Sequence, residues 1–165
     1  MHYIGLDIGG TKCAATLGTL NGEPVVTDKE YFLTAGQKPE IILERFASFI
    51  EKHRKNYEIG GIGISCGGPL DSRRGIIMRP PSLPLWDDIE IVKYFDERFG
   101  IPTFLQNDAN ACAVAEWKYG AGTVGSFMCD LNGNWSSKFM ADKTGQKFLY
   151  SAINKVFPTE DIRPK

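Results

Sequence analysis

Two consecutive glycines, Gly9 and Gly10, separate two short apolar segments close to the start of the chain. Residues 2–8 and 12–20 predict β-strands, which places the glycines in a tight turn between them. Glycine in a turn either supplies a positive φ or lets the backbone approach a neighbour without a Cβ in the way. This hairpin constrains the fold most, because it commits the N-terminus to an antiparallel strand pair.

A third strand is expected to extend this pair. Asn21 and Gly22 form a typical two-residue turn that leads into a strand at about 25–34. Beyond it, apolar periodicity predicts helices and strands in alternation, with helices at 38–55, 88–98 and 107–119 and strands at 58–66 and 101–106. The sequence therefore predicts an α/β fold with a mixed sheet, three antiparallel strands and flanking helices.

The helix boundaries rest on local signals. Pro39 suits the first turn of the first helix. Asp87 and Glu90 have the spacing of a capping box and predict that the second helix begins at about 88. The pattern weakens past Gly120, where a segment at 145–156 is a further helix candidate.

Composition narrows the class of protein. The chain has 165 residues, of which 42% are hydrophobic and 24% charged, and its formal net charge is −1. It should fold as a globular domain, and its charge gives no general reason to bind nucleic acid or an anionic membrane. Four widely spaced cysteines and no secretory leader predict a cytoplasmic protein with reduced thiols. With two histidines in the chain, a metal site built from His or Cys is not expected.

The opening hairpin carries groups that suit a phosphate ligand. Asp7 precedes the glycine pair, and Thr11 and Lys12 follow it. Backbone amides free of a Cβ can approach an oxyanion, a carboxylate can hold hydrated Mg²⁺, and a hydroxyl or ammonium can reach phosphate. The alternative is an ordinary β-turn whose glycines only supply positive φ. The combination of groups favours phosphate binding.

A second constellation lies where the 101–106 strand meets the following helix. Asn107 or Asp108 has the position of a helix N-cap, which is the more common role for such residues. For chemistry, Asp108 would accept a proton from a substrate hydroxyl while Asn107 hydrogen-bonds a neighbouring one. The Gly67-Gly68-Pro69 turn either lets the backbone approach a sugar or is an ordinary strand exit.

Other features favour structural interpretations. The Walker phosphate-loop pattern is absent, and the literal G-x-G-x-x-G at 120–125 follows a helix rather than a strand, so it predicts a helix exit and not a dinucleotide site. Arg73 and Arg74 are expected in a solvated loop. The tryptophans are expected in the core or an interface; they are Trp86, Trp117 and Trp135.

Taken together, these motifs resemble the ROK (repressor, open reading frame, kinase) family of sugar kinases and regulators. The resemblance covers about residues 2–125, in the family's order and spacing, through the stretches 4–12, 61–71, 75–86 and 107–122. It implies an actin-like, ribonuclease-H-like N-terminal kinase lobe over 1–125. Ser82 stands where the family usually has asparagine, which leaves the preferred sugar open.

The resemblance also implies roles for individual residues. ATP phosphates and Mg²⁺ would lie at the hairpin, with Asp7 as the metal-binding residue and phosphate contacts from Gly9, Gly10, Thr11 and Lys12. A hexose-type sugar would lie near Gly67, Gly68 and Asn107. Asp108 would be the base that activates a sugar hydroxyl for attack on the γ-phosphate.

The sequence departs from the family after Gly125. Residues 126–165 form an atypical C-terminal tail without the family's second lobe, its E-x-G-H motif or its zinc-binding cysteines, so the zinc site of the family is not expected. A lone chain is then expected to be inactive or nearly so, because a kinase cleft needs two walls.

Alternatives to a kinase lobe are a sugar-responsive regulator fragment and a non-catalytic module. The first is disfavoured, because Met1 leaves no room for a DNA-binding segment before the first strand. In the second, the tail covers the cleft face or pairs two lobes into a homodimer.

Overall fold

The computed structural model describes residues 1–21 and 23–112. The chain divides into two units after Gly122, so all described residues belong to the first. Residue 22 and residues 113–165 lie outside the described part of the chain. The helix candidate at 145–156, the 120–125 motif, Trp117 and Trp135 are therefore untested predictions.

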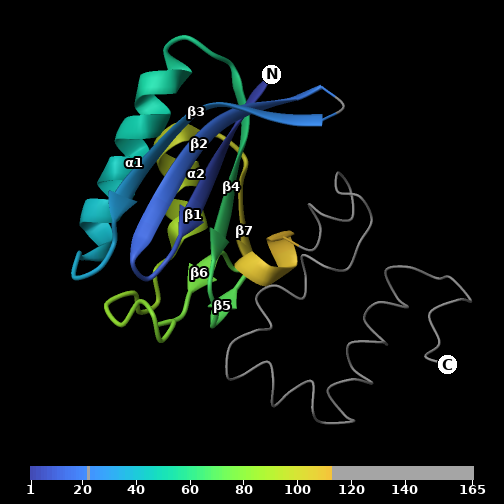
Figure 1. Cartoon of the computed structure of the whole chain (residues 1–165). Coiled ribbons are helices and arrows are strands. Elements are labelled where there is room, and N and C mark those ends of the chain that lie inside the picture. Colours follow the sequence, from blue (N-terminus) through green and yellow to red (C-terminus); the bar gives the residue numbers. More distant parts are fainter. Residues whose placement is uncertain (22, 113–165) are drawn as a thin grey trace, which may run out of the picture. The chain divides into compact units, whose positions relative to one another are not determined.

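A five-stranded mixed sheet forms the centre of the described unit (Figure 1). Its order is β3-β2-β1-β4-β7. The strands are β1 (His2–Ile8), β2 (Lys12–Asn21), β3 (Glu23–Leu33), β4 (Ile59–Cys66) and β7 (Thr103–Asn107). Pairing is antiparallel between β1 and β2 and between β2 and β3, and it is parallel between β1 and β4 and between β4 and β7. Two short strands, β5 (Leu70–Asp71) and β6 (Ile76–Ile77), form a separate antiparallel pair that the sequence did not predict.

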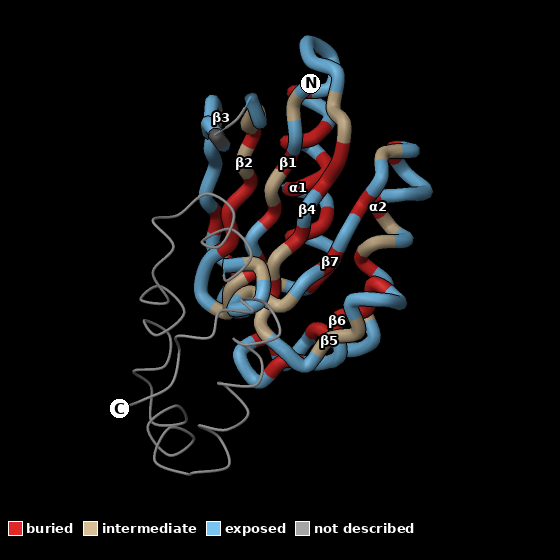
Figure 2. Tube along the Cα trace, turned by 90° about the vertical axis from the view of Figure 1, so that its right-hand side faces the viewer, coloured by how far each residue is buried: buried red, intermediate tan, exposed pale blue. Residues whose placement is uncertain are grey.

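Two helices, α1 (Pro39–Arg54) and α2 (Ile91–Phe99), cover one face of the sheet. Phe46 of α1 packs edge-on against Phe32 of β3 and Phe95 of α2, with ring centroids 5.0 and 6.5 Å apart. The inward residues of the strands join the same core, so buried positions alternate with exposed ones (Figure 2). Within the described residues, no helix is long and apolar enough to cross a membrane.

The second helix begins later than the sequence predicts. Glu90 is the residue before α2, and its side chain makes no capping hydrogen bond, so the predicted capping box is wrong. Its carboxylate instead accepts a hydrogen bond from Lys93 Nζ at 3.1 Å. Ile89 cannot join the helix, because its backbone exchanges two hydrogen bonds of 3.0 Å with Ile77. Pro39 is at the start of α1, as predicted.

The Ile77–Ile89 bridge closes a loop at residues 78–88, which we call the 78–88 loop. Three of its side chains are buried, namely Pro80, Leu83 and Trp86. The positions between and beside them are exposed, including Ser82 and Leu85. Trp86 is 1% exposed, which confirms its predicted place in the core. The loop is therefore anchored at both ends by the bridge and along its length by every third side chain.

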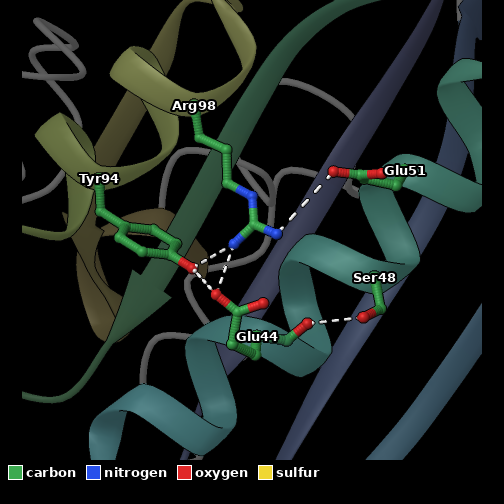
Figure 3. Close-up of polar contacts among 5 residues, drawn as sticks. All are labelled: Glu44, Ser48, Glu51, Tyr94 and Arg98. Atoms are coloured by element: carbon green, nitrogen blue, oxygen red, sulfur yellow. Dashed lines mark hydrogen bonds and ion pairs between the residues drawn. The ribbon is translucent and has the colours of Figure 1, made fainter.

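A polar cluster joins α1 to α2 outside the core (Figure 3). Glu44 Oε1 accepts hydrogen bonds from Tyr94 Oη at 2.7 Å and from Arg98 Nη1 at 2.5 Å. Arg98 Nη2 also lies 3.9 Å from Glu51 Oε1. The hydrogen bonds from Arg98 and then Tyr94 lower the pKa of the Glu44 carboxyl, because they favour its charged form.

This cluster predicts a pH effect on stability. Because the Glu44 pKa is lowered on folding, its contribution is present above the ordinary pKa of glutamate, about 4.3, and is lost as the pH falls through the folded-state value. Glu44→Gln is expected to flatten the stability profile in that acidic range. Urea unfolding at pH 3 to 7 measures this. Asp28 also has a lowered pKa, so the variant should retain some acid sensitivity. An unchanged profile would contradict the assignment to Glu44.

Candidate functional site

Three parallel strands end at the same edge of the sheet. Ile8 at the end of β1 pairs with Cys66 at the end of β4, and Cys66 pairs with Asn107 at the end of β7. The opening hairpin, the Gly67-Gly68 turn and the helix after β7 therefore leave the sheet side by side. In parallel sheets this carboxyl edge is where ligands usually bind.

Asp7 is exposed at this edge. Its Oδ1 accepts a hydrogen bond of 2.7 Å from the hydroxyl of Ser65, which is its register partner on β4. The carboxylate thus has one oxygen held by the sheet while its side chain remains open to solvent. A solvent-facing carboxylate with a fixed orientation is a suitable group for a hard cation such as Mg²⁺.

Neighbouring atoms lie so close to the two hairpin glycines that neither position has room for a Cβ. A Cβ on Gly9 would lie 2.7 Å from the carbonyl oxygen of Lys12, and one on Gly10 would lie 2.6 Å from both Cβ and the carbonyl oxygen of Ser82. Neither glycine is among the described residues with positive φ, so the alternative that they only supply positive φ is wrong. The 78–88 loop packs directly on the turn.

Backbone hydrogen bonds hold the residues that follow the glycine pair. The carbonyl oxygen of Thr11 accepts hydrogen bonds from the amides of Thr34 and Ala35, at 2.9 and 3.3 Å. Thr11 and Lys12 have exposed side chains, and Lys12 Nζ lies 5.5 Å from the ring centroid of Tyr31. The hydroxyl and ammonium are thus available beside the turn, and their phosphate contacts remain predictions.

The contact between Gly10 and Ser82 leads to a stability prediction. Gly10→Ala is expected to destabilise the fold by about 1 to 3 kcal/mol, because the new methyl group meets backbone as well as a side chain. Gly63→Ala is the matched control, since a Cβ there meets nothing within 4 Å. Urea unfolding followed by far-ultraviolet circular dichroism measures both. Equal free energies of unfolding for the two variants would show that the 78–88 loop moves to accommodate the new methyl group without loss of stability.

Asn107 and Asp108 begin the helix after β7, in which residues 108–112 are helical. Asn107 Oδ1 accepts hydrogen bonds from the amides of Ala109 and Asn110, at 3.1 and 3.4 Å, so Asn107 is an N-cap. Asp108 Oδ1 accepts one of 2.8 Å from Ala109. All three hydrogen bonds end on an Oδ1 atom, which leaves Asn107 Nδ2 and Asp108 Oδ2 for other partners.

Those remaining atoms lie beside the glycine turn. A Cβ on Gly67 would lie 3.8 Å from Asp108 Oδ2, and one on Gly68 would lie 3.6 Å from Asn107 Nδ2. The structure therefore brings together the four residues that the resemblance assigns to the sugar. The Arg73 and Arg74 amides donate 3.0 Å hydrogen bonds to Asp71 Oδ1, and both residues are exposed, as predicted for a solvated loop.

Two buried thiols, Cys66 and Cys13, lie beneath the edge. Burial, with smaller effects of Asp108, Cys13 and Asp7, raises the pKa of Cys66 to about 12. The pKa of Cys13 is also raised by burial, against an opposing hydrogen bond with Thr34. Asp7 is the carboxylate that raises the pKa of both thiols, and its effect is smaller than that of burial.

The thiols give a reactivity prediction. Cys13 and Cys66 are expected to resist iodoacetamide in the native chain at pH 8, because both are buried and protonated. Both should react fully after unfolding in guanidinium chloride. Peptide mass spectrometry of the alkylated chain measures this. Rapid native modification of Cys66 would mean that the site edge opens readily.

A hollow of about 640 Å³ lies elsewhere, between β3 and α1. Its lining includes Glu30, Glu40 and Lys52 but no predicted site residue. Ser65 is the site residue that sequence reasoning missed; aligning β1 with β4 in parallel would have placed it beside Asp7.

The β3-β2-β1-β4-β7 sheet, with its site at the carboxyl edge, defines an actin-like ATPase fold. Residues 3–128 match the ROK family model, and the chain belongs to the ROK family. Among curated proteins it is 34% identical over 119 residues to a glucokinase of Streptomyces coelicolor, covering 72% of this chain and 36% of that protein. It is 30% identical over 124 residues to a xylose repressor of Bacillus spizizenii, covering 73% and 32%.

Solved structures agree with this assignment. A ROK hexokinase from Thermus thermophilus is 38% identical with a TM-score of 0.63, covering 74% of this chain and 40% of that one. A ROK glucokinase from Streptomyces griseus, in complex with glucose and AMPPNP, is 28% identical with a TM-score of 0.64, covering 74% and 38%. The chain thus spans about a third of the length of these curated relatives and about two fifths of these structures.

Proposed function

We propose that this chain forms one wall of an ATP-dependent hexose kinase, which transfers the γ-phosphate of ATP to a sugar hydroxyl. The observation that carries the proposal is the shared carboxyl edge of β1, β4 and β7. Along this edge the Asp7 hairpin and the Asn107–Asp108 pair lie on either side of β4. Similarity to glucokinases supports the same chemistry.

The residues at the hairpin fit a nucleotide with its metal. Asp7 offers an exposed carboxylate, Gly9 and Gly10 present backbone without a Cβ, and Thr11 and Lys12 add a hydroxyl and an ammonium. When bound, Mg²⁺ would neutralise charge on the transferring phosphate. The chain's own part is to hold the phosphates against the sheet edge through these groups.

The residues at the glycine turn fit a sugar. Gly67 and Gly68 allow close approach, and Asn107 Nδ2 can donate to one hydroxyl. Asp108 Oδ2 accepts the proton of the hydroxyl that attacks. An oriented carboxylate is adequate for phosphoryl transfer, because the loose transition state of that reaction depends more on an oriented nucleophile than on a strong base.

The proposal requires a second wall for the cleft. The chain spans about a third of the curated relatives' length. We infer that the opposing wall of the cleft corresponds to the part of those relatives that this chain does not match. The isolated chain is then expected to bind substrates weakly and to transfer phosphate slowly or not at all.

A hybrid protein tests the function. Residues 3–128 would replace the matching segment of the Streptomyces coelicolor glucokinase, and a hexose panel would be assayed with ATP. ATP-dependent phosphorylation of a hexose is the expected result. Amide chemical-shift changes in the isolated chain, confined to the carboxyl edge on adding glucose, would support sugar binding independently. A folded hybrid that neither binds nor phosphorylates any hexose would contradict the proposal.

The second candidate is a sugar-responsive regulator or binding module, which the similarity to a xylose repressor favours. The hybrid separates the two, because a regulator-type lobe would bind sugar without phosphate transfer. The net charge of −1 supports the expectation that this chain does not bind nucleic acid. Sequence-specific binding to the promoter of a sugar operon would overturn that expectation.

A further inference from the structure

Ser65 lies between the two halves of the proposed site. In the sheet, Asp7 of β1 pairs with Ser65 of β4, and Ser65 pairs with Gln106 of β7. The three residues form a row one step inside the carboxyl edge. The hairpin lies beyond Asp7, and the Asn107–Asp108 pair lies beyond Gln106. None of the roles assigned above includes Ser65.

The side chains of this row divide into two groups. Gln106 Oε1 accepts hydrogen bonds from the Asn107 amide at 2.8 Å and from Asn110 Nδ2 at 3.3 Å, so it belongs to the helix start. The Ser65 hydroxyl instead donates to Asp7 Oδ1 at 2.7 Å. Within the described residues, this is the one side chain that holds the Asp7 carboxylate.

We propose that Ser65 is a positioning residue for Asp7, which orients the carboxylate toward the cation of a bound metal–nucleotide. Asp7 Oδ1 accepts the hydrogen bond from the Ser65 hydroxyl. Asp7 Oδ2 accepts no hydrogen bond from the described residues and remains available to the cation or its water. A carboxylate on an exposed strand end would otherwise rotate among several orientations. Because the hydrogen bond already fixes the orientation of the carboxylate, less conformational entropy is lost when the cation binds.

The inference rests on the proposed nucleotide site and extends it to a residue that touches neither metal nor nucleotide. Loss of a group that orients a metal-binding side chain typically weakens metal affinity by about 10- to 100-fold. Because Ser65 provides a single hydrogen bond, Ser65→Ala is expected near the lower end of that range. Ser65→Thr keeps the hydroxyl and is therefore expected to bind with an affinity close to that of wild type.

The test titrates the full chain with the Mn²⁺ complex of AMPPNP and follows water-proton relaxation enhancement, which does not require turnover. Asp7→Asn serves as the reference for loss of the cation-binding carboxylate. Ser48→Ala is the matched control, because Ser48 is an exposed serine on α1 whose hydroxyl donates to the Glu44 carbonyl, away from the site. Thermal unfolding of each variant reports separately on the fold.

Weaker binding in Ser65→Ala, with binding retained in Ser65→Thr and Ser48→Ala and with unchanged unfolding temperatures, supports the positioning role. Wild-type affinity in Ser65→Ala overturns it and leaves the proposed nucleotide site intact. Equal losses in folded Ser65→Ala and Ser65→Thr also overturn it, because the hydroxyl would then not be the cause. No binding by the wild-type chain overturns both the nucleotide site and the role of Ser65.

Discussion

Asp108→Asn is expected to lower the rate of phosphate transfer from ATP to a hexose by about 100- to 10,000-fold, the usual contribution of a general base. The substitution keeps the shape of the side chain and an acceptor for the Ala109 amide, which lies 2.8 Å from Oδ1. It replaces Oδ2, which faces Gly67, with an amide nitrogen that cannot accept a proton. The helix start is thus preserved while the proposed base is removed.

This experiment is best done in the glucokinase hybrid, with radiolabelled ATP to detect slow transfer. Asp96→Asn is the control, because Asp96 is an exposed carboxylate on α2. Sugar binding by the Asp108 variant should fall much less than the rate, so kcat should carry most of the loss. A variant that retains more than about a tenth of the wild-type kcat would exclude Asp108 as the base, because a general base typically contributes at least a hundredfold.

Phe46→Ala is expected to destabilise the fold by about 3 to 5 kcal/mol. Phe46 is fully buried, and it is the aromatic side chain that links α1 to both β3 and α2. Its removal leaves a cavity among rings that are held by separate elements, so the core cannot close over it without moving a helix. For a domain with a typical stability of about 5 to 15 kcal/mol, this is a large fraction of the total.

Chemical unfolding followed by circular dichroism measures this loss. Phe104→Ala provides the comparison, because Phe104 is 69% exposed on β7 and should change stability by no more than about 0.5 kcal/mol. Similar losses for the two variants would mean that the exposed face of β7 is covered in solution. A loss below about 1 kcal/mol for Phe46→Ala would show that the core repacks more freely than cavity data suggest.

The central elements could be predicted from sequence because several signals agree there. Turn residues, apolar alternation and Pro39 all indicate β1, β2, β3 and α1, and the structure has these elements within about two residues of their expected bounds. The start of α2 could not be predicted in the same way. Its capping pattern competes with the Ile77–Ile89 bridge, which is a tertiary contact that no local pattern shows.

The candidate site was predictable where its residues are adjacent in the chain. Asp7 and the residues after it form one motif, as do Asn107 and Asp108. The contacts between motifs were not predictable, because they depend on strand order and register. Ser65 meets Asp7 across 58 residues of sequence, and Ser82 meets Gly10 only through the path of the 78–88 loop.

The 78–88 loop has two exposed residues between each pair of buried ones, and this spacing affects which positions around the site can vary. Pro80, Leu83 and Trp86 are buried and fix the path of the loop, whereas Ser82 is exposed and lies against Gly10 of the hairpin. Substitutions at the exposed positions can therefore alter what lies next to the hairpin at small cost to stability. Variation that changes the surroundings of the hairpin is therefore least costly at these loop positions, whereas Gly9 and Gly10 leave no room for a Cβ.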